Sequence, residues 1–390
     1  MEQNISINHV ENFFPEGSLN LLCYKGAQRI YGTLLPEEVV DRLEFEQEII
    51  KKAGAEHQLL VAQDIVNTAM NELGVLVGPG RSAIAGSLVA FCLGITGVDP
   101  LKHDLLFERF INPETLILSN IYIDIDNAGL ESVINWFENK YGVGNIENCM
   151  EQETGIYLIG IDSLAKIKTI LAAVKKSEGI DIDLKTIPLD DPKTFDLFQH
   201  GFTDGVFCFD SGSIQQWLRY LHPTIFNDLV ILNVMFRPGI EDYIPQILQR
   251  KRGKEKIEYS IPAMEKYLQE TYGIPIYQEQ LMMLSRLIAD FSRGDSDRLR
   301  KALCKRKQVV LDELKPRFIE GGVSNGYKRE ILEEIWNEWY SIGFYAYCKA
   351  HSVCYTYIAY QMAYLNAHFP KVFDSVIKNE AVSPFYRILI

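Results

Sequence analysis

Residues 116–126 are predicted to form a β-strand with two unlike faces, because polar and apolar side chains alternate from Asn120 to Asp126. The apolar face carries Ile121, Ile123 and Ile125. The polar face carries Asn120, Tyr122, Asp124 and Asp126. Because carboxylates two residues apart can bridge divalent ions, the polar face resembles a two-metal phosphoryl-transfer site in which two positions are neutral.

Longer segments repeat hydrophobic residues every three or four positions and predict helices. They cover residues 36–50, 58–73, 82–93, 130–141, 276–291, 296–305 and 355–368, and a second strand is predicted at 157–161. The helix predicted at 82–93 follows a Gly-Pro-Gly turn, so its amide terminus is expected to face an anion. The pattern therefore favours a mixed α/β region followed by a mostly helical one.

Length and composition restrict the class of protein. A chain of 390 residues with 47% hydrophobic content can bury a sizeable core. It has no apolar run of the eighteen or so residues that a membrane span needs, and its first residues lack a signal-peptide pattern. The seven cysteines form no paired Cys-x-x-Cys motifs, which is typical of reduced thiols. We therefore expect a cytoplasmic protein with no membrane partner.

Charge is distributed unevenly along the chain. The net charge is −13, with 15 basic and 30 acidic residues in 1–200 but 24 basic and 22 acidic residues in 201–390. The basic residues of the second half form two clusters, namely Arg250, Lys251, Arg252, Lys254 and Lys256, and Arg298, Arg300, Lys301, Lys305, Arg306 and Lys307. They are either a phosphate-binding surface or an ordinary solvated one, because acidic residues are interspersed among them.

A series of motifs follows one another along the chain. They are Val77–Thr96, Asp99–Leu101, Leu105–Glu114, Ile187–Phe195, Gly205–Ser211, Phe236–Gly239, Tyr277–Gln280 and His351–Ser352 with Tyr360–Gln361. Together they resemble the C-family replicative polymerases, the alpha subunits of bacterial DNA polymerase III, over roughly residues 20–375.

The resemblance implies a fold. It implies an α/β (α+β) nucleotidyltransferase-like palm at residues 1–235, followed by a mostly helical fingers-like domain at 236–390. The family's thumb is expected to be almost entirely deleted near 143–156. The family's N-terminal phosphoesterase domain and its further C-terminal domains are also expected to be missing.

The resemblance also assigns catalytic positions. In an ungapped register, the first two metal-binding aspartates of the family stand here as Asn120 and Tyr122, and Asp124 follows them as a remnant carboxylate. The third catalytic aspartate is expected at Asp228, on a neighbouring strand. A register shifted by two residues remains open, in which Asp124, Asp126 and Asp228 together bind Mg²⁺. In the unshifted register no cofactor is expected, since an amide and a neutral phenol attract Mg²⁺ weakly.

Binding residues follow from the same resemblance. The family's Gly-Arg-Gly-Ser turn, which lies near the triphosphate, reads Gly80-Arg81-Ser82-Ala83 here, and Ser82 or Ser87 would have to replace the missing hydroxyl. The expected nucleotide- or DNA-binding residues are Arg81, Ser82, Ser87, Arg237, Arg250, Lys251, Arg300, Lys301, Lys305, Lys349 and His351.

These observations favour a polymerase-like protein of DNA replication that has lost catalysis and binds nucleic acid, a nucleotide, or a replication or defence protein. One alternative is an active, shortened DNA-directed DNA polymerase that uses Asp124, Asp126 and Asp228. A second alternative is a structural subunit of a larger replication or defence complex, which the acidic first half favours.

Overall fold

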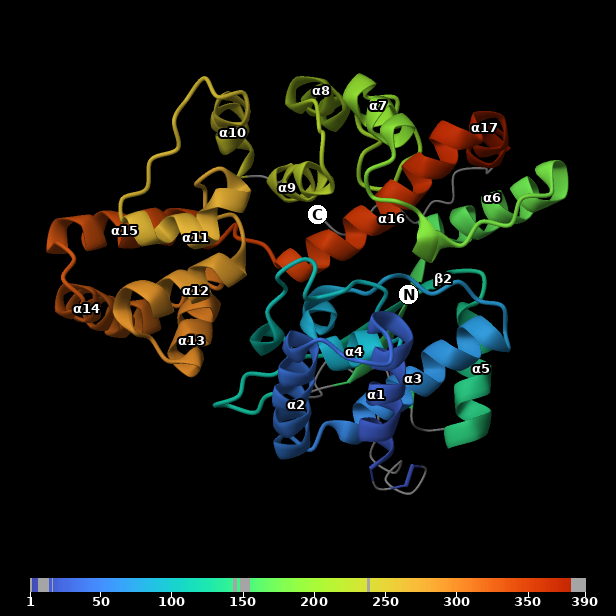
Figure 1. Cartoon of the computed structure of the whole chain (residues 1–390), viewed down its shortest axis with the longest axis horizontal. Helices are drawn as coiled ribbons and strands as arrows, with labels where there is room; N and C mark the ends of the chain where they lie inside the picture. The colour runs from blue at the N-terminus through green and yellow to red at the C-terminus, as the bar shows by residue number, and fades with distance from the viewer. Residues whose placement is uncertain are drawn as a thin grey trace.

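The computed structural model describes residues 2–5, 14–15, 17–142, 146–147, 155–236 and 239–379, with backbone alone at 2–5, 146–147 and 379. Helices dominate, and the strands form a single described sheet. Buried apolar side chains gather into three clusters, which belong to three regions of the chain. Figure 1 shows these regions as the lower part, the upper part and the left part of the molecule.

The first region holds the sheet and the N-terminal helices. The helices are α1 (Ser18–Tyr31), α2 (Glu37–Lys52), α3 (Glu56–Asn71), α4 (Leu88–Cys92) and α5 (Leu130–Tyr141), with the 3₁₀ turns η1 (Ser82–Gly86) and η2 (Phe107–Arg109). The strands are β1 (Glu2–Ile5), β2 (Ile121–Asp126), β3 (Ile146–Glu147) and β4 (Ile156–Ile161). The order in the sheet is β2-β4-β1-β3, with β2 parallel to β4 and β1 antiparallel to both β4 and β3.

Strand β2 has the two faces that its alternation predicts. Ile121, Ile123 and Ile125 lie in the core of the first region, at most 2% exposed. The polar face is not a solvent face, because Asp124 and Asp126 are at most 1% exposed. It is covered by the second region, whose helix α6 (Asp162–Glu178) packs against β2. Both faces of β2 are thus buried, and its carboxylates need partners within the protein.

The second region is built around α16, which runs through the middle of the molecule (Figure 1). Its helices are α6 (Asp162–Glu178), α7 (Pro192–His200), α8 (Gly212–Leu221), α9 (Phe226–Met235), α10 (Ile244–Lys251), α16 (Lys349–His368) and α17 (Pro370–Asn379), with turns η3 (Leu184–Thr186) and η4 (Glu241–Tyr243). Residues of α16 such as Ile358, Tyr360 and Met362 are fully buried, which explains why this helix is apolar on nearly every side.

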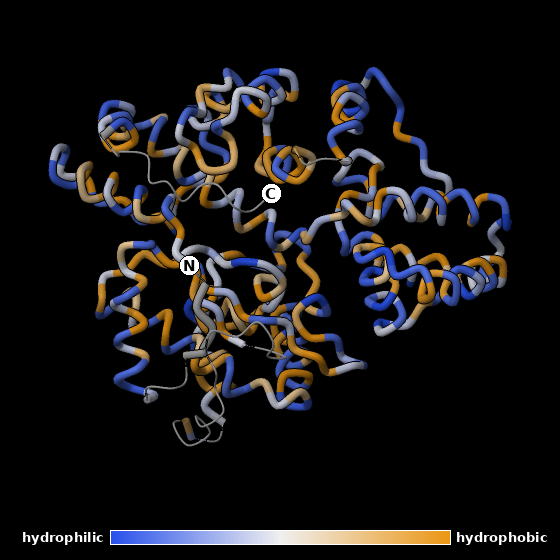
Figure 2. The backbone as a smooth tube through the Cα atoms, turned by 180° about the vertical axis from the view of Figure 1, so that it is seen from behind, coloured by the Kyte–Doolittle hydropathy of each residue, from blue (hydrophilic) through white to orange (hydrophobic). Residues whose placement is uncertain are grey.

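The third region is a compact group of helices with its own core, and we call it the helical module. It contains α11 (Glu265–Leu268), α12 (Gln278–Ala289), α13 (Arg293–Cys304), α14 (Gln308–Ser324) and α15 (Arg329–Ile342), with turns η5 (Pro262–Met264) and η6 (Gln269–Thr271). Trp339, Phe318 and Leu284 are fully buried at its centre. Figure 2 shows apolar and polar residues alternating along these helices, as expected for helices with one buried side.

Most of the predicted elements are confirmed within one to a few residues, including α2, α3, α5, α12, α13 and both predicted strands. The helix predicted at 82–93 is wrong in its first half. There the chain forms the 3₁₀ turn η1, with Ser82 in the left-handed region at φ 61, and regular α-helix begins only at Leu88. The prediction of a helix beginning at the Gly-Pro-Gly turn is therefore corrected. Among the described helices, none has the length and apolar character needed to cross a membrane.

Candidate functional site

The polar face of β2 begins with two neutral residues that satisfy each other. The Asn120 side-chain amide donates to the Tyr122 hydroxyl over 3.2 Å, and its carbonyl oxygen accepts from the Gly155 amide at 3.3 Å. The Tyr122 ring stacks on Tyr157 of β4, with ring centroids 5.1 Å apart. At this end, the polar face of β2 therefore presents the Asn120 amide beside the stacked rings of Tyr122 and Tyr157.

Asp124 is bound by an arginine from the loop before η1. Arg81 Nε lies 2.8 Å from Asp124 Oδ1, and the Arg81 guanidinium also donates to the Tyr355 hydroxyl of α16. The same guanidinium lies 5.1 Å from the centre of the Tyr355 ring. An internal cation, held from two sides, thus lies against the carboxylate that a metal ion would require.

Burial dominates the ionisation of Asp124. It raises the pKa of Asp124 to about 6, although the neighbouring Arg81 favours the charged form. Within the described residues, the second oxygen of Asp124 has no hydrogen-bond partner. Asp124 therefore pairs with Arg81 in its ionised form but is protonated more readily than an exposed aspartate.

Asp126 is bound by backbone amides and by a lysine. Its carboxylate accepts from the Leu76 amide at 2.7 Å and the Gly129 amide at 2.8 Å, and Lys168 of α6 lies 3.1 Å away. These contacts join β2 to the loop before Val77 and to the turn that starts α5. The Asp126 carboxylate is therefore occupied by backbone amides and Lys168.

Asp228 does not lie on a strand beside β2, so the predicted placement is wrong. It lies in the first turn of α9, where its carboxylate accepts from the amides of Thr224 and Ile225 at 2.8 and 3.2 Å. Lys251 and the Tyr272 hydroxyl also bind it. The strand that does lie beside β2 is β4, with the sequence Ile-Tyr-Leu-Ile-Gly-Ile and no carboxylate.

The residues of this face do not fit a divalent metal. Asn120 and Tyr122 are neutral and bonded to each other, Asp124 is bound to Arg81, and Asp126 is bound to backbone amides and Lys168. Across the parts of the chain that the structure describes, no three His, Cys, Asp or Glu side chains converge as metal ligands. We therefore derive no chemical step through Mg²⁺ at this face.

The expected phosphate-binding hydroxyls have different surroundings. The Ser82 amide donates to His351 Nδ1 at 3.3 Å, and the His351 ring lies 4.2 Å from that of Tyr355, so both residues adjoin the Arg81 contact. Ser87 is fully buried and donates to Glu46 of α2 over 2.7 Å. Glu46 also accepts from the first two amides of α4, so a carboxylate of the protein itself occupies the place expected for a phosphate.

Tyr355, which completes the Arg81 contact, was not among the residues predicted from the sequence. Tyr355 stands four residues after His351 on α16, so the two share one side of the helix. That spacing is the signal that identifies it.

Most of the basic residues expected to bind DNA are paired with carboxylates. Arg250 binds Glu255 at 2.9 Å, Lys251 binds Asp228, Arg300 and Lys301 bind Asp297 at 2.9 and 2.7 Å, and Lys349 binds Glu270 at 2.7 Å. Arg237 lies outside the described residues. Lys305 is exposed, and its side chain has no hydrogen bond or ion pair among the described residues. It begins an exposed basic turn, Lys305–Lys307, in which Arg306 lies 4.3 Å from the centre of the Phe344 ring.

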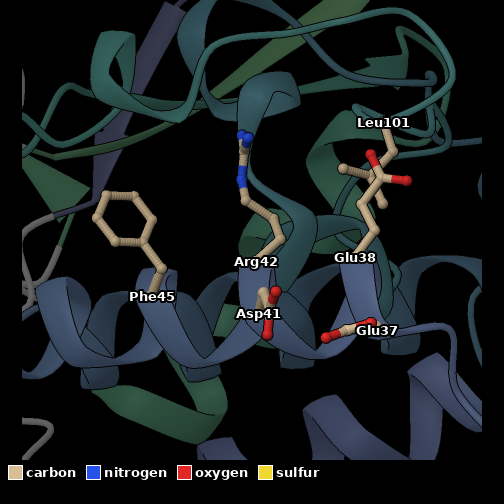
Figure 3. Close-up of a pocket in the computed structure, with 6 residues that line it drawn as sticks. All are labelled: Glu37, Glu38, Asp41, Arg42, Phe45 and Leu101. Carbon is tan, nitrogen blue, oxygen red and sulfur yellow. The ribbon is translucent and has the colours of Figure 1, made fainter.

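A pocket lies elsewhere, on α2. It has a volume of about 530 Å³ and is lined by Glu37, Glu38, Asp41, Arg42, Phe45 and Leu101. Figure 3 shows Arg42 extending away from the helix, and its guanidinium donates to the carbonyls of Gly86 and Leu105 at 3.0 and 3.1 Å. With its cation directed to internal carbonyls and three carboxylates at its rim, this pocket does not suit an anion.

Comparison with known proteins covers both halves of the chain. Residues 17–155 match the bacterial DNA polymerase III alpha NTPase domain, and residues 163–326 match the bacterial DNA polymerase III alpha subunit finger domain. The DNA polymerase III alpha subunits of Aquifex aeolicus and Halalkalibacterium halodurans are each 29% identical to this chain, over 93% of it. The Staphylococcus aureus subunit is 29% identical over 88%.

In each case the match covers 43% of the relative, so the chain spans less than half the length of these curated relatives. Two adjoining domain models and relatives matched over nearly the whole chain agree on one assignment. The chain belongs to the family of bacterial DNA polymerase III alpha subunits.

Proposed function

We propose that this protein keeps the palm and fingers arrangement of its family, does not catalyse nucleotidyl transfer, and acts in DNA replication as a binding scaffold. One observation carries the proposal. The polar face of β2 holds an amide and a phenol at the two metal-binding positions, and Arg81 pairs with the carboxylate that follows them. At these two positions the face lacks the anionic oxygens that two Mg²⁺ ions require.

The small sheet serves as the palm in this interpretation, and the helical module serves as part of the fingers. The alignment with the Aquifex aeolicus subunit extends over 505 positions, whereas this chain has 390 residues. The relative therefore has residues within the matched stretch that this chain lacks, which supports the absence of a duplex-gripping thumb. A replication role places the protein in the bacterial cytoplasm.

The alternative of an active polymerase using Asp124, Asp126 and Asp228 receives no support from the contacts. The three aspartates are bound respectively by Arg81, by backbone amides with Lys168, and by Lys251 with Tyr272. Each would have to exchange an internal partner for a metal ion.

Nucleic acid is the ligand that we propose for the scaffold, with the turn Lys305–Lys307 as the main contact. This turn is exposed and combines three cations with the half-exposed Phe344, a combination that suits a phosphate backbone and a stacked base. A replication or defence protein remains the other partner class, favoured by the acidic first half of the chain.

A primer-extension assay tests the loss of catalysis. We expect no template-dependent product from the wild-type protein with Mg²⁺ or Mn²⁺, and little from Asn120→Asp with Tyr122→Asp, because Arg81 still pairs with Asp124. A full-length active alpha subunit is the positive control. Extension by the wild type that disappears in Asp124→Ala would contradict the proposal and establish the shifted register.

The raised pKa of Asp124 predicts how stability depends on pH. Its folded value of about 6 exceeds the ordinary value of 3.8, so the folded state binds this proton more tightly than the unfolded state. The stabilisation is complete below about pH 4 and is lost as the pH rises through about 6. From the size of the shift it amounts to about 3 kcal/mol in the free energy of unfolding.

Urea unfolding of the wild type and Asp124→Asn between about pH 4 and about pH 7 measures this effect. The difference between the two proteins isolates Asp124 from other titrating groups. A difference that stays constant across this range would show that Asp124 ionises as freely in the folded protein as in the unfolded one.

The DNA contact is tested by affinity across a salt series. Lys305→Ala with Lys307→Ala should weaken binding to all sequences alike and flatten the salt dependence, because fewer counterions are released. Lys328→Ala with Arg329→Ala is a matched control that removes the same charge at the far end of α14. Equal curves for both variants, or no wild-type binding at low salt, would favour a protein partner instead.

A further inference from the structure

The helical module shares no apolar core with the first region. Most of its buried residues form a cluster of their own, whereas Ile276, Tyr277 and Ile342, close to the connections of the module, belong to the core of the second region. Figure 1 shows the module on the left, connected by the loop before α11 and by the start of α16. Regions joined mainly by polar contacts can move relative to each other as rigid bodies.

Away from these connections, the module is held by η2 and by the loop that follows it. Glu108 is only 7% exposed and lies between two guanidinium groups of the module, 3.2 Å from Arg286 Nη1 and 3.3 Å from Arg293 Nε. Arg293 is 45% exposed and also lies over the Phe45 ring of α2, 4.9 Å from its centre. Water therefore reaches part of this contact.

The same loop caps a helix of the module. Glu114 accepts from the Ser292 hydroxyl and the Gly294 amide, each at 2.8 Å, at the N-terminus of α13. The Asn112 side-chain amide donates to the Arg293 carbonyl at 2.9 Å. A carboxylate at this end of α13 is favoured by the helix dipole, and it comes from outside the module.

A different kind of contact holds the connected end. The Gln278 amide donates to the Tyr347 carbonyl and the Tyr347 amide donates to the Ile276 carbonyl, each at 2.9 Å. These backbone bonds join the start of α12 to the strand-like segment before α16. Such a joint can remain intact while the opposite side of the module separates.

We propose that the helical module swings about the Ile276–Gln278 and Tyr347 joint, and that Glu108, Asn112 and Glu114 form a latch that holds it against the first region. The two carboxylates of the latch make charge-assisted hydrogen bonds, which salt weakens, whereas the core of the module is apolar and insensitive to salt. The inference is independent of whether nucleotidyl transfer occurs.

The test compares Glu108→Gln with Glu114→Gln against a matched control, Glu313→Gln. Glu313 pairs with Arg298 inside the module, so the control makes the same kind of change without touching the latch. Small-angle X-ray scattering reports the separation of the module, and hydrogen exchange reports the amides at the N-terminus of α13 and those of α14.

We expect the double variant to have a larger radius of gyration than the wild type and the control. Exchange at Gly294 and Asp295 should be faster by about tenfold, with α14 within about twofold of the wild type. Raising the salt from about 0.05 M to about 1 M should open the wild type in the same direction. Unchanged scattering and exchange would refute the latch. Loss of protection throughout α14 would also contradict the proposal, because the module and the first region would then unfold as one unit.

Discussion

The contact between Arg81 and Asp124 is the constraint on which the centre of this molecule depends. A carboxylate on a strand with two buried faces needs a cation, and Arg81 supplies it from the loop before η1 while Tyr355 of α16 holds the guanidinium. Two glycines let that loop pass between strand and helix. A Cβ on Gly78 would lie 3.0 Å from the Asp124 Cβ, and one on Gly80, whose φ is +127, would lie 3.3 Å from the Cys354 sulfur.

A buried ion pair of this kind contributes little to stability relative to an apolar replacement, but breaking one partner leaves an uncompensated charge. The main effect of the Arg81–Asp124 pair is therefore on the geometry of the site and not on the stability of the fold. The pair joins the first region to α16 and supplies a cation beside Asp124 from within the protein. The polar face of β2 is thus an internal contact between regions.

Sequence patterns predicted the local structure well, because strand alternation and helical periodicity depend on neighbouring residues. Both faces of β2 and most helices, such as α2 and α5, were predictable in this way. Contacts between distant residues were not. Arg81 and Tyr355 are 274 positions apart, and nothing near Ser87 indicated that Glu46 would occupy the start of α4. Asp228 was misplaced because a motif identifies a residue without showing whether it lies on a strand or in a helix.

The central claim is that Arg81, and not a divalent metal ion, is the cation that pairs with Asp124. Calorimetric titration of Mn²⁺ into the wild type and Asp124→Asn, at about pH 7.5 where Asp124 is ionised, tests it most directly. The account predicts the same weak heats for both proteins, since no metal binds at Asp124. Stoichiometric Mn²⁺ binding by the wild type that is lost in Asp124→Asn would contradict it.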